Sequence, residues 1–205
     1  MLRLLINSVC IALALAIMSG CSGLQRDTSK AADASPNVPP AVLRSYQQAL
    51  DEMRNGKDGL AIAAFEAFII EYPDYSAAYL NLAKLQLRTD QADAAIATLE
   101  TAMLVEPSYA PAYNQLGIIY REQGQFESAD TAYRAAIAAN PDYALAYLNL
   151  GVLNDLYLQQ PQVALVYYQQ YRDRLPADAD TAALDRWIAD LQRRTASVEA
   201  GELKQ

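Results

Sequence analysis

The sequence PDYSAAY at residues 73–79 recurs as PSYAPAY at residues 107–113 and as PDYALAY at residues 141–147, with a spacing of 34 residues each time. Further positions downstream of the motif keep the same period: Leu82, Leu116 and Leu150, then Ala83, Gly117 and Gly151, then Ala95 and Ala129. Self-similarity at a fixed period of this length indicates a repeat architecture, in which each unit buries its apolar face against its neighbours.

Each repeat carries the pattern of two helices. In the clearest unit, one helix face is formed by residues at i, i+3, i+4 and i+7, namely Tyr113, Leu116, Gly117 and Tyr120. Gly124 interrupts the pattern, and a second face follows with Ala129, Tyr133, Ala136 and Ile137 before Pro141 ends the helix.

This period and pattern resemble the tetratricopeptide repeat, a helix-turn-helix unit. The resemblance implies that the two helices of a unit cross most closely at Gly117 and Ala129, where a larger side chain would cost roughly 1–3 kcal/mol. The resemblance covers residues 42–178 and implies an all-α fold, a right-handed α-solenoid of about four units at residues 42–75, 76–109, 110–143 and 144–178. The first unit matches mainly in its second helix, which suits an atypical terminal repeat. The last unit has one extra residue between Gly151 and Ala164, and Asn154 stands where the family has an aromatic residue.

A capping helix is expected at residues 179–194. Asp180 can cap its start, and Leu184, Trp187, Ile188 and Leu191 form its apolar face. The opposite face is expected to keep the open end of the array soluble, through Asp185, Arg186, Asp190, Arg193 and Arg194. Residues 195–205 are expected to form a frayed tail.

Residues 1–20 have the features of a secretory signal peptide, with a cation at Arg3, an apolar stretch at residues 4–17 and small residues before Cys21. The sequence MSGC at residues 18–21 resembles the lipobox of bacterial lipoproteins, which implies that Cys21 becomes the lipid-modified first residue of the mature chain. Ser22 after the cysteine implies, by the same resemblance, an outer-membrane lipoprotein facing the periplasm. Cleavage after Ala16, which would give a soluble periplasmic protein, is the alternative.

Residues 21–41 are expected to be a flexible tether behind this lipid anchor. Three Pro and three Ser interrupt a segment without hydrophobic periodicity, which is a composition that cannot bury enough apolar surface to order itself.

Composition excludes several kinds of chemistry. The chain has no His, which removes Ser-His-Asp and Cys-His catalysis, and its two Cys cannot form a Cys-only metal site. A net charge of −8 argues against nucleic-acid binding. We therefore predict no catalytic residue, no metal, no cofactor and no small-molecule substrate; a carboxylate-dependent hydrolase of cell-wall polymers is the enzymatic alternative.

The first helices of the units are expected to line a concave groove that binds a protein or peptide partner. Periodicity assigns the following residues to it: Leu80, Asn81, Lys84, Arg88, Asn114, Ile118, Arg121, Leu148, Asn149 and Val152. Their amides can bind a peptide backbone and their cations an acidic segment. The alternative is that the Asn side chains satisfy local backbone groups and the cations are ordinary solvated charges.

These features together predict a non-enzymatic adaptor anchored by lipid in the cell envelope. The architecture resembles the pilotin-type lipoproteins, whose role implies help in assembling the secretin of a type IV pilus or secretion system. Related architecture also serves lipoproteins that coordinate peptidoglycan synthases or hydrolases, and self-association in a structural role is a third possibility. The sequence leaves these alternatives open.

Overall fold

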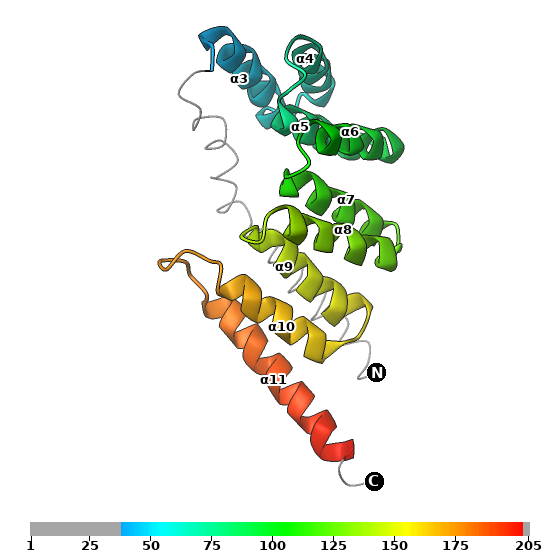
Figure 1. Cartoon of the computed structure of the whole chain (residues 1–205), viewed down its shortest axis with the longest axis vertical. Coiled ribbons are helices and arrows are strands. Elements are labelled where there is room, and N and C mark those ends of the chain that lie inside the picture. The colour runs from blue at the N-terminus through cyan, green and yellow to red at the C-terminus, as the bar shows by residue number, and fades with distance from the viewer. Residues whose placement is uncertain (1–37, 203–205) are drawn as a thin grey trace. The chain divides into compact units, whose positions relative to one another are not determined.

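The structure, a computed structural model, describes residues 38–202, with side chains through residue 196. Every regular element in this part is helical: α3 (Pro40–Arg54), α4 (Asp58–Glu71), α5 (Ser76–Arg88), α6 (Ala92–Val105), α7 (Ala110–Glu122), α8 (Phe126–Ala139), α9 (Ala144–Val152), the π-helix η1 (Leu153–Tyr157), α10 (Pro161–Arg172) and α11 (Ala182–Glu202) (Figure 1). The predicted all-α class is confirmed for the described residues. The predictions for the signal peptide, Cys21 and most of the tether lie outside them.

The chain divides into two units, residues 1–45 and 46–205, with the boundary inside α3. Of the first unit only residues 38–45 are described. The helix begins at Pro40, within the range expected for the tether, because a proline at the first helical position has no intrahelical bond to lose. Ser45 Oγ donates to the carbonyl oxygens of Val42 at 3.1 Å and Ala41 at 3.2 Å.

The second unit is built from helix pairs. Contacts within the pairs α5–α6, α7–α8 and α9–α10 are more extensive than those between successive pairs. The pairs follow one another along the chain, so that α5, α7 and α9 are the first helices and α6, α8 and α10 the second helices of successive repeats (Figure 1). This arrangement confirms the predicted solenoid of helix-turn-helix units.

A left-handed residue marks the turn inside each repeat. Backbone φ is +71° at Gly56, +59° at Asp90, +75° at Gly124 and +56° at Gln159. The first three are spaced by 34 residues, and glycine adopts this conformation without a steric penalty. The fourth comes 35 residues after the third, so the extra residue of the last unit lies before Gln159.

The π-helical turn η1 accommodates that extra residue. Its wider i→i+5 bonding is seen where Leu158 N donates to Leu153 O at 3.0 Å. Asn154, which is 2% exposed, donates from Nδ2 to Leu150 O at 2.8 Å. The insertion therefore changes the register inside the first helix of the last unit instead of lengthening its turn.

In the pairs α7–α8 and α9–α10, the two helices approach closely where the sequence has glycine. A Cβ atom at Gly117 would lie 2.5 Å from Cε1 of Tyr133, and one at Gly151 would lie 2.5 Å from Cδ1 of Tyr168. Ala129, on the opposing helix, is fully buried. The structure thus confirms Gly117 as a close-packing position.

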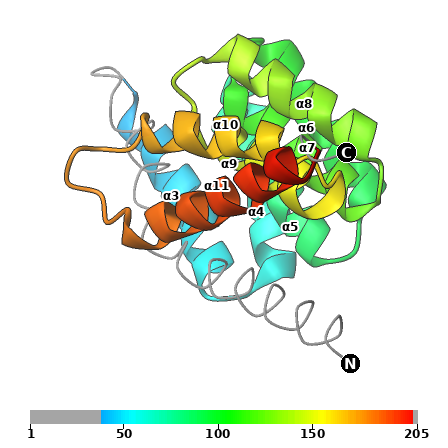
Figure 2. The same cartoon turned by 90° about the horizontal axis from the view of Figure 1, so that it is seen from below.

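The last helix, α11, packs alongside α10 (Figure 2). Asp180 Oδ1 accepts a hydrogen bond from Ala182 N at 3.1 Å at its start, and Ile188 and Leu191 are buried against Tyr168. One detail differs from the sequence-based expectation: the helix continues to Glu202, past the expected end at Arg194. Arg194 is exposed and lies 3.4 Å from Asp190 of the outer polar face, and it also pairs with Asp155 at 2.9 Å.

Within residues 38–202, none of the helices combines the length and the apolarity that a bilayer crossing requires.

Candidate functional site

The residues expected to line the groove lie on the first helices, but they differ in accessibility. We call this set the first-helix face; it consists of Leu80, Asn81, Lys84 and Arg88 on α5, Asn114, Ile118 and Arg121 on α7, and Leu148, Asn149 and Val152 on α9. Arg88 is exposed, Leu80 and Asn114 are buried, and the others are partly exposed. The face is therefore a set of interrepeat contacts as well as a surface.

Leu80 and Asn114 correct the expectation of accessible side chains. Leu80 is 3% exposed and belongs to the same core cluster as Leu116 and Ile119 of α7. Asn114 is 5% exposed, and its Oδ1 accepts a hydrogen bond from Asn149 Nδ2 at 2.8 Å. Periodicity predicts the direction in which a side chain points, but it does not predict what lies against that side chain. The first helix of the following unit covers both residues: α7 covers Leu80, and α9 covers Asn114.

The asparagines of the face connect neighbouring repeats. Asn81 Nδ2 donates to Tyr46 Oη at 2.8 Å, across the same 35-residue separation as the bond between Asn149 and Asn114. The junction between α5 and α7 lies between these two bonded junctions. Its residues at the equivalent positions are Leu80 and Gln115. In the structure, the amides of Asn81 and Asn149 thus bond to side chains of the preceding unit and not to local backbone groups. Peptide binding by these amides stays a prediction.

The three cations of the face have different partners. Arg88 is paired with Asp58 of α4, and its Nη2 also lies 3.4 Å from Met53 O. Lys84 makes no ion pair within the described part of the chain, and burial lowers the pKa of its amine. Arg121, whose side chain is 10% exposed, has its nearest carboxylate at 4.0 Å on Glu122. Lys84 and Arg121 therefore carry charges that no side chain of α5 or α7 fully compensates.

Arg121 lies in an aromatic environment with too few hydrogen-bond acceptors. Its guanidinium carbon is 5.9 Å from the ring centroid of Tyr157, and its Nε is buried without a hydrogen-bond partner. The hydroxyl of Tyr133 is also buried without a partner, and burial raises its pKa to about 12, an effect that Arg121 partly opposes. An acceptor with negative charge is the group that this environment lacks.

The α9 part of the face is largely covered by α11. Leu148 and Val152 pack against the cluster that contains Ile188 and Leu191. The sequence could not reveal this coverage, because it depends on where the capping helix docks. The accessible part of the first-helix face is accordingly carried by α5 and α7.

The described residues contain no group of three or more His, Cys, Asp or Glu side chains placed to hold a metal ion. The accessible face instead carries cations and amides set among apolar side chains.

Comparisons with known proteins agree with this architecture. A model described as tetratricopeptide repeat matches residues 46–117, and one described as TPR repeat matches residues 117–154. Residues 46–154 therefore consist of tetratricopeptide repeats, a class whose stacked helices generally form binding surfaces for protein partners and are typically non-catalytic. No curated protein matches the chain in sequence.

Solved structures show the same fold. The chain is similar to MamA, with a TM-score of 0.55 and 25% identity over 65% of this chain and 72% of that one. It is similar to PilF of Pseudomonas aeruginosa, with a TM-score of 0.65 and 19% identity over 77% of this chain and 70% of that one. It is also similar to a tetratricopeptide protein of Thermus thermophilus, with a TM-score of 0.60 and 21% identity over 91% of this chain and 97% of that one.

Proposed function

We propose that the chain is a non-enzymatic adaptor that is anchored to the outer membrane by a lipid on Cys21, faces the periplasm and binds an acidic segment of a protein partner on α5 and α7. The observation that carries the binding proposal is the state of Lys84 and Arg121. Both are partly buried, and neither has a carboxylate at close ion-pair distance. Since desolvated cations are costly without a counter-charge, partner carboxylates at these two positions would gain strong, specific interactions.

The envelope role is proposed from the sequence. The lipobox resemblance at residues 18–21 supports the anchor, and the combination of lipid and tetratricopeptide array supports help in assembling an envelope complex, such as the secretin of a type IV pilus or secretion system. Coordination of peptidoglycan synthases or hydrolases is the second candidate, because the same combination suits it equally.

Photocrosslinking in cells can separate these candidates. A crosslinking amino acid at Gln115, a partly exposed position on α7, should capture the partner, whereas the same probe at exposed Gln162 on α10 should not. Adducts with a secretin or pilus component would support the pilus or secretion role, and adducts with a cell-wall synthase or hydrolase would support the second candidate. Identical adducts from both positions would contradict binding on the first-helix face.

Charge removal tests the acidic ligand. The double variant Lys84→Met, Arg121→Met should no longer form the Gln115 adducts, because the partner's carboxylates lose both cations. The variant should fold normally, because neither cation has a close counter-charge within the described part of the chain. Arg134→Met is the matched control, since Arg134 is a cation of α8 that is already paired with Asp130 at 2.6 Å. The anchor is tested separately: Cys21→Ser should abolish acyl labelling and release the protein from outer-membrane fractions.

A further inference from the structure

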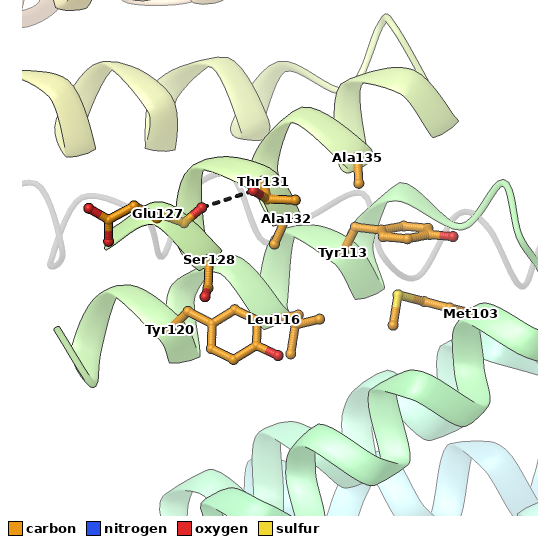
Figure 3. Close-up of a pocket in the computed structure, with 9 residues that line it drawn as sticks. All are labelled: Met103, Tyr113, Leu116, Tyr120, Glu127, Ser128, Thr131, Ala132 and Ala135. Carbon is orange, nitrogen blue, oxygen red and sulfur yellow. Dashed lines mark hydrogen bonds between the residues drawn. The ribbon is translucent and has the colours of Figure 1, made fainter. Parts of the chain in front are cut away.

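A pocket lies on a different part of the array, where the second helices α6 and α8 flank α7. Its volume is about 480 Å³, and nine residues line it: Met103, Tyr113, Leu116, Tyr120, Glu127, Ser128, Thr131, Ala132 and Ala135 (Figure 3). Figure 3 shows the rings of Tyr113 and Tyr120 on either side of Leu116, with Met103 on the facing helix. None of the residues of the first-helix face lines this pocket.

The pocket is open at this junction because its aromatic floor is not covered. Tyr113 and Tyr120 are partly exposed. In the unit before, the equivalent residues Tyr79 and Gln86 are 7% and 8% exposed. In the unit after, the equivalent Tyr147 is 5% exposed, and Asn154 is 2% exposed. The same positions are therefore buried in the units directly before and after, and partly exposed in the unit of α7 and α8.

The rim of the pocket is acidic. Glu127, in the first turn of α8, lines it. The Thr131 hydroxyl donates to the backbone carbonyl oxygen of Glu127 at 2.9 Å and not to its carboxylate. Glu100 is exposed on α6, three residues before Met103, and so lies on the same side of that helix. Neither carboxylate makes an ion pair within the described residues, and none of the nine lining residues is a cation.

An apolar floor with an unpaired acidic rim selects the chemistry of its occupant. An apolar side chain would bury surface against Tyr113, Leu116 and Met103, and a neighbouring Lys or Arg would meet the carboxylates. We infer that this pocket is a second docking site, which takes a protein segment carrying an apolar side chain flanked by Lys or Arg. Its charge preference is opposite to that of the first-helix face, so one chain can hold an acidic and a basic segment at the same time.

Selection of random dodecapeptides displayed on phage, against the immobilised full chain, tests this site. Selected peptides should carry an apolar residue next to Lys or Arg, and their binding to the purified chain is then measured by fluorescence anisotropy. The Kd should rise about tenfold or more in the Glu100→Gln, Glu127→Gln double variant and in Thr131→Trp, which fills the pocket from an exposed position. Thermal unfolding establishes that each variant is folded.

The matched control is Glu66→Gln. Glu66 is exposed and takes on α4 the position that Glu100 takes on α6, but no residue of α4 lines the pocket. This variant should bind the selected peptides as the parent chain does, and so should Lys84→Met with Arg121→Met.

Three results would overturn the inference. The first is a selection that yields no binders or no excess of Lys and Arg. The second is peptides whose affinity depends on Lys84 and Arg121 and not on the pocket, which would leave the proposed function intact. The third is a monomer–dimer equilibrium in sedimentation that Thr131→Trp abolishes, because the occupant would then be a second copy of this chain.

Discussion

Arg194 of α11 donates a hydrogen bond to Asp155 of η1 at 2.9 Å, and the Asp155 side chain is only 3% exposed. This pair ties the last helix to the π-helical turn. Asp155 takes the position in its unit that Arg121 takes in the preceding one. In the final unit, the charge at this position is therefore compensated by the capping helix, whereas the preceding unit leaves a cation there without a close counter-charge.

Arg194→Ala should destabilise the chain by about 1–3 kcal/mol, because it leaves a buried carboxylate without its cation. Hydrogen exchange of α11 should also become faster. Arg193→Ala is the control: Arg193 pairs with Asp190 at 3.0 Å, but both side chains are exposed, so the loss should stay below about 0.5 kcal/mol. Equal losses in chemical denaturation would mean that the Asp155 pair does not hold α11.

Replacing glycine by alanine should change the stability of the chain differently at two positions. Gly117→Ala places a Cβ 2.5 Å from the buried ring of Tyr133 and should cost about 1–3 kcal/mol. Gly59→Ala, in the first turn of α4, meets no atom within 4 Å and should be neutral or stabilise the chain by about 0.4–1 kcal/mol. Thermal unfolding of both variants checks the pair, and a harmless Gly117→Ala would show that the helices can separate without loss.

The fold could be predicted because its determinants are local and repeated. A turn motif at 73–79, 107–113 and 141–147 fixes where each pair begins, and small residues such as Gly117 fix where the helices cross. The site of the extra residue was not predictable in the same way. A longer turn and a π-helical turn would each add one residue to the period, so the sequence does not distinguish them. The structure places the extra residue in η1, where Asn154 and Asp155 are buried.

The candidate sites depend on contacts between units, which the sequence period does not reveal. The period assigned Leu80 and Asn114 to one face of the first helices, but the next unit partly covers that face and buries both side chains. The coverage of Leu148 and Val152 by α11 depends on tertiary docking. The pocket beside Tyr113 and Tyr120 could not be predicted either, because the equivalent residues of the neighbouring units are buried.

The bond between Asn114 and Asn149 can be tested by transplanting the neighbouring junction. Asn114→Leu should cost about 0.5–1.5 kcal/mol, since it leaves the partly buried Asn149 amide without its acceptor. The double variant Asn114→Leu, Asn149→Gln reproduces the residues found at positions 80 and 115 and should recover part of that loss. Chemical denaturation of the full cycle gives the coupling energy, and additive losses would contradict an interaction between the two positions.

Tyr133→Phe should stabilise the chain by about 1–2 kcal/mol near pH 7, because it removes a buried hydroxyl without a hydrogen-bond partner. Tyr147→Phe is the matched control. The Tyr147 hydroxyl donates to Pro141 O at 2.9 Å, so its removal should cost about 0.5–1.5 kcal/mol. In thermal unfolding, Tyr133→Phe should raise the stability and Tyr147→Phe should lower it. A loss of stability in both variants would mean that the Tyr133 hydroxyl has a hydrogen-bond partner.

Tyr133 should also affect how the unfolding free energy depends on pH in alkaline solution. Burial raises the pKa of Tyr133 from 10.0 to about 12, so the folded state keeps its proton where the unfolded state loses it. Ionisation of Tyr133 therefore leaves the unfolding free energy unchanged below pH 10 and lowers it as the pH rises from about 10 to 12. Tyr46 and Tyr143 are shifted in the same direction and also to about 12. Tyr133→Phe should therefore reduce, but not abolish, the fall in unfolding free energy across this range. An unchanged slope in urea titrations at pH 9.5 to 12 would show that the hydroxyl ionises as easily in the folded state as in the unfolded one.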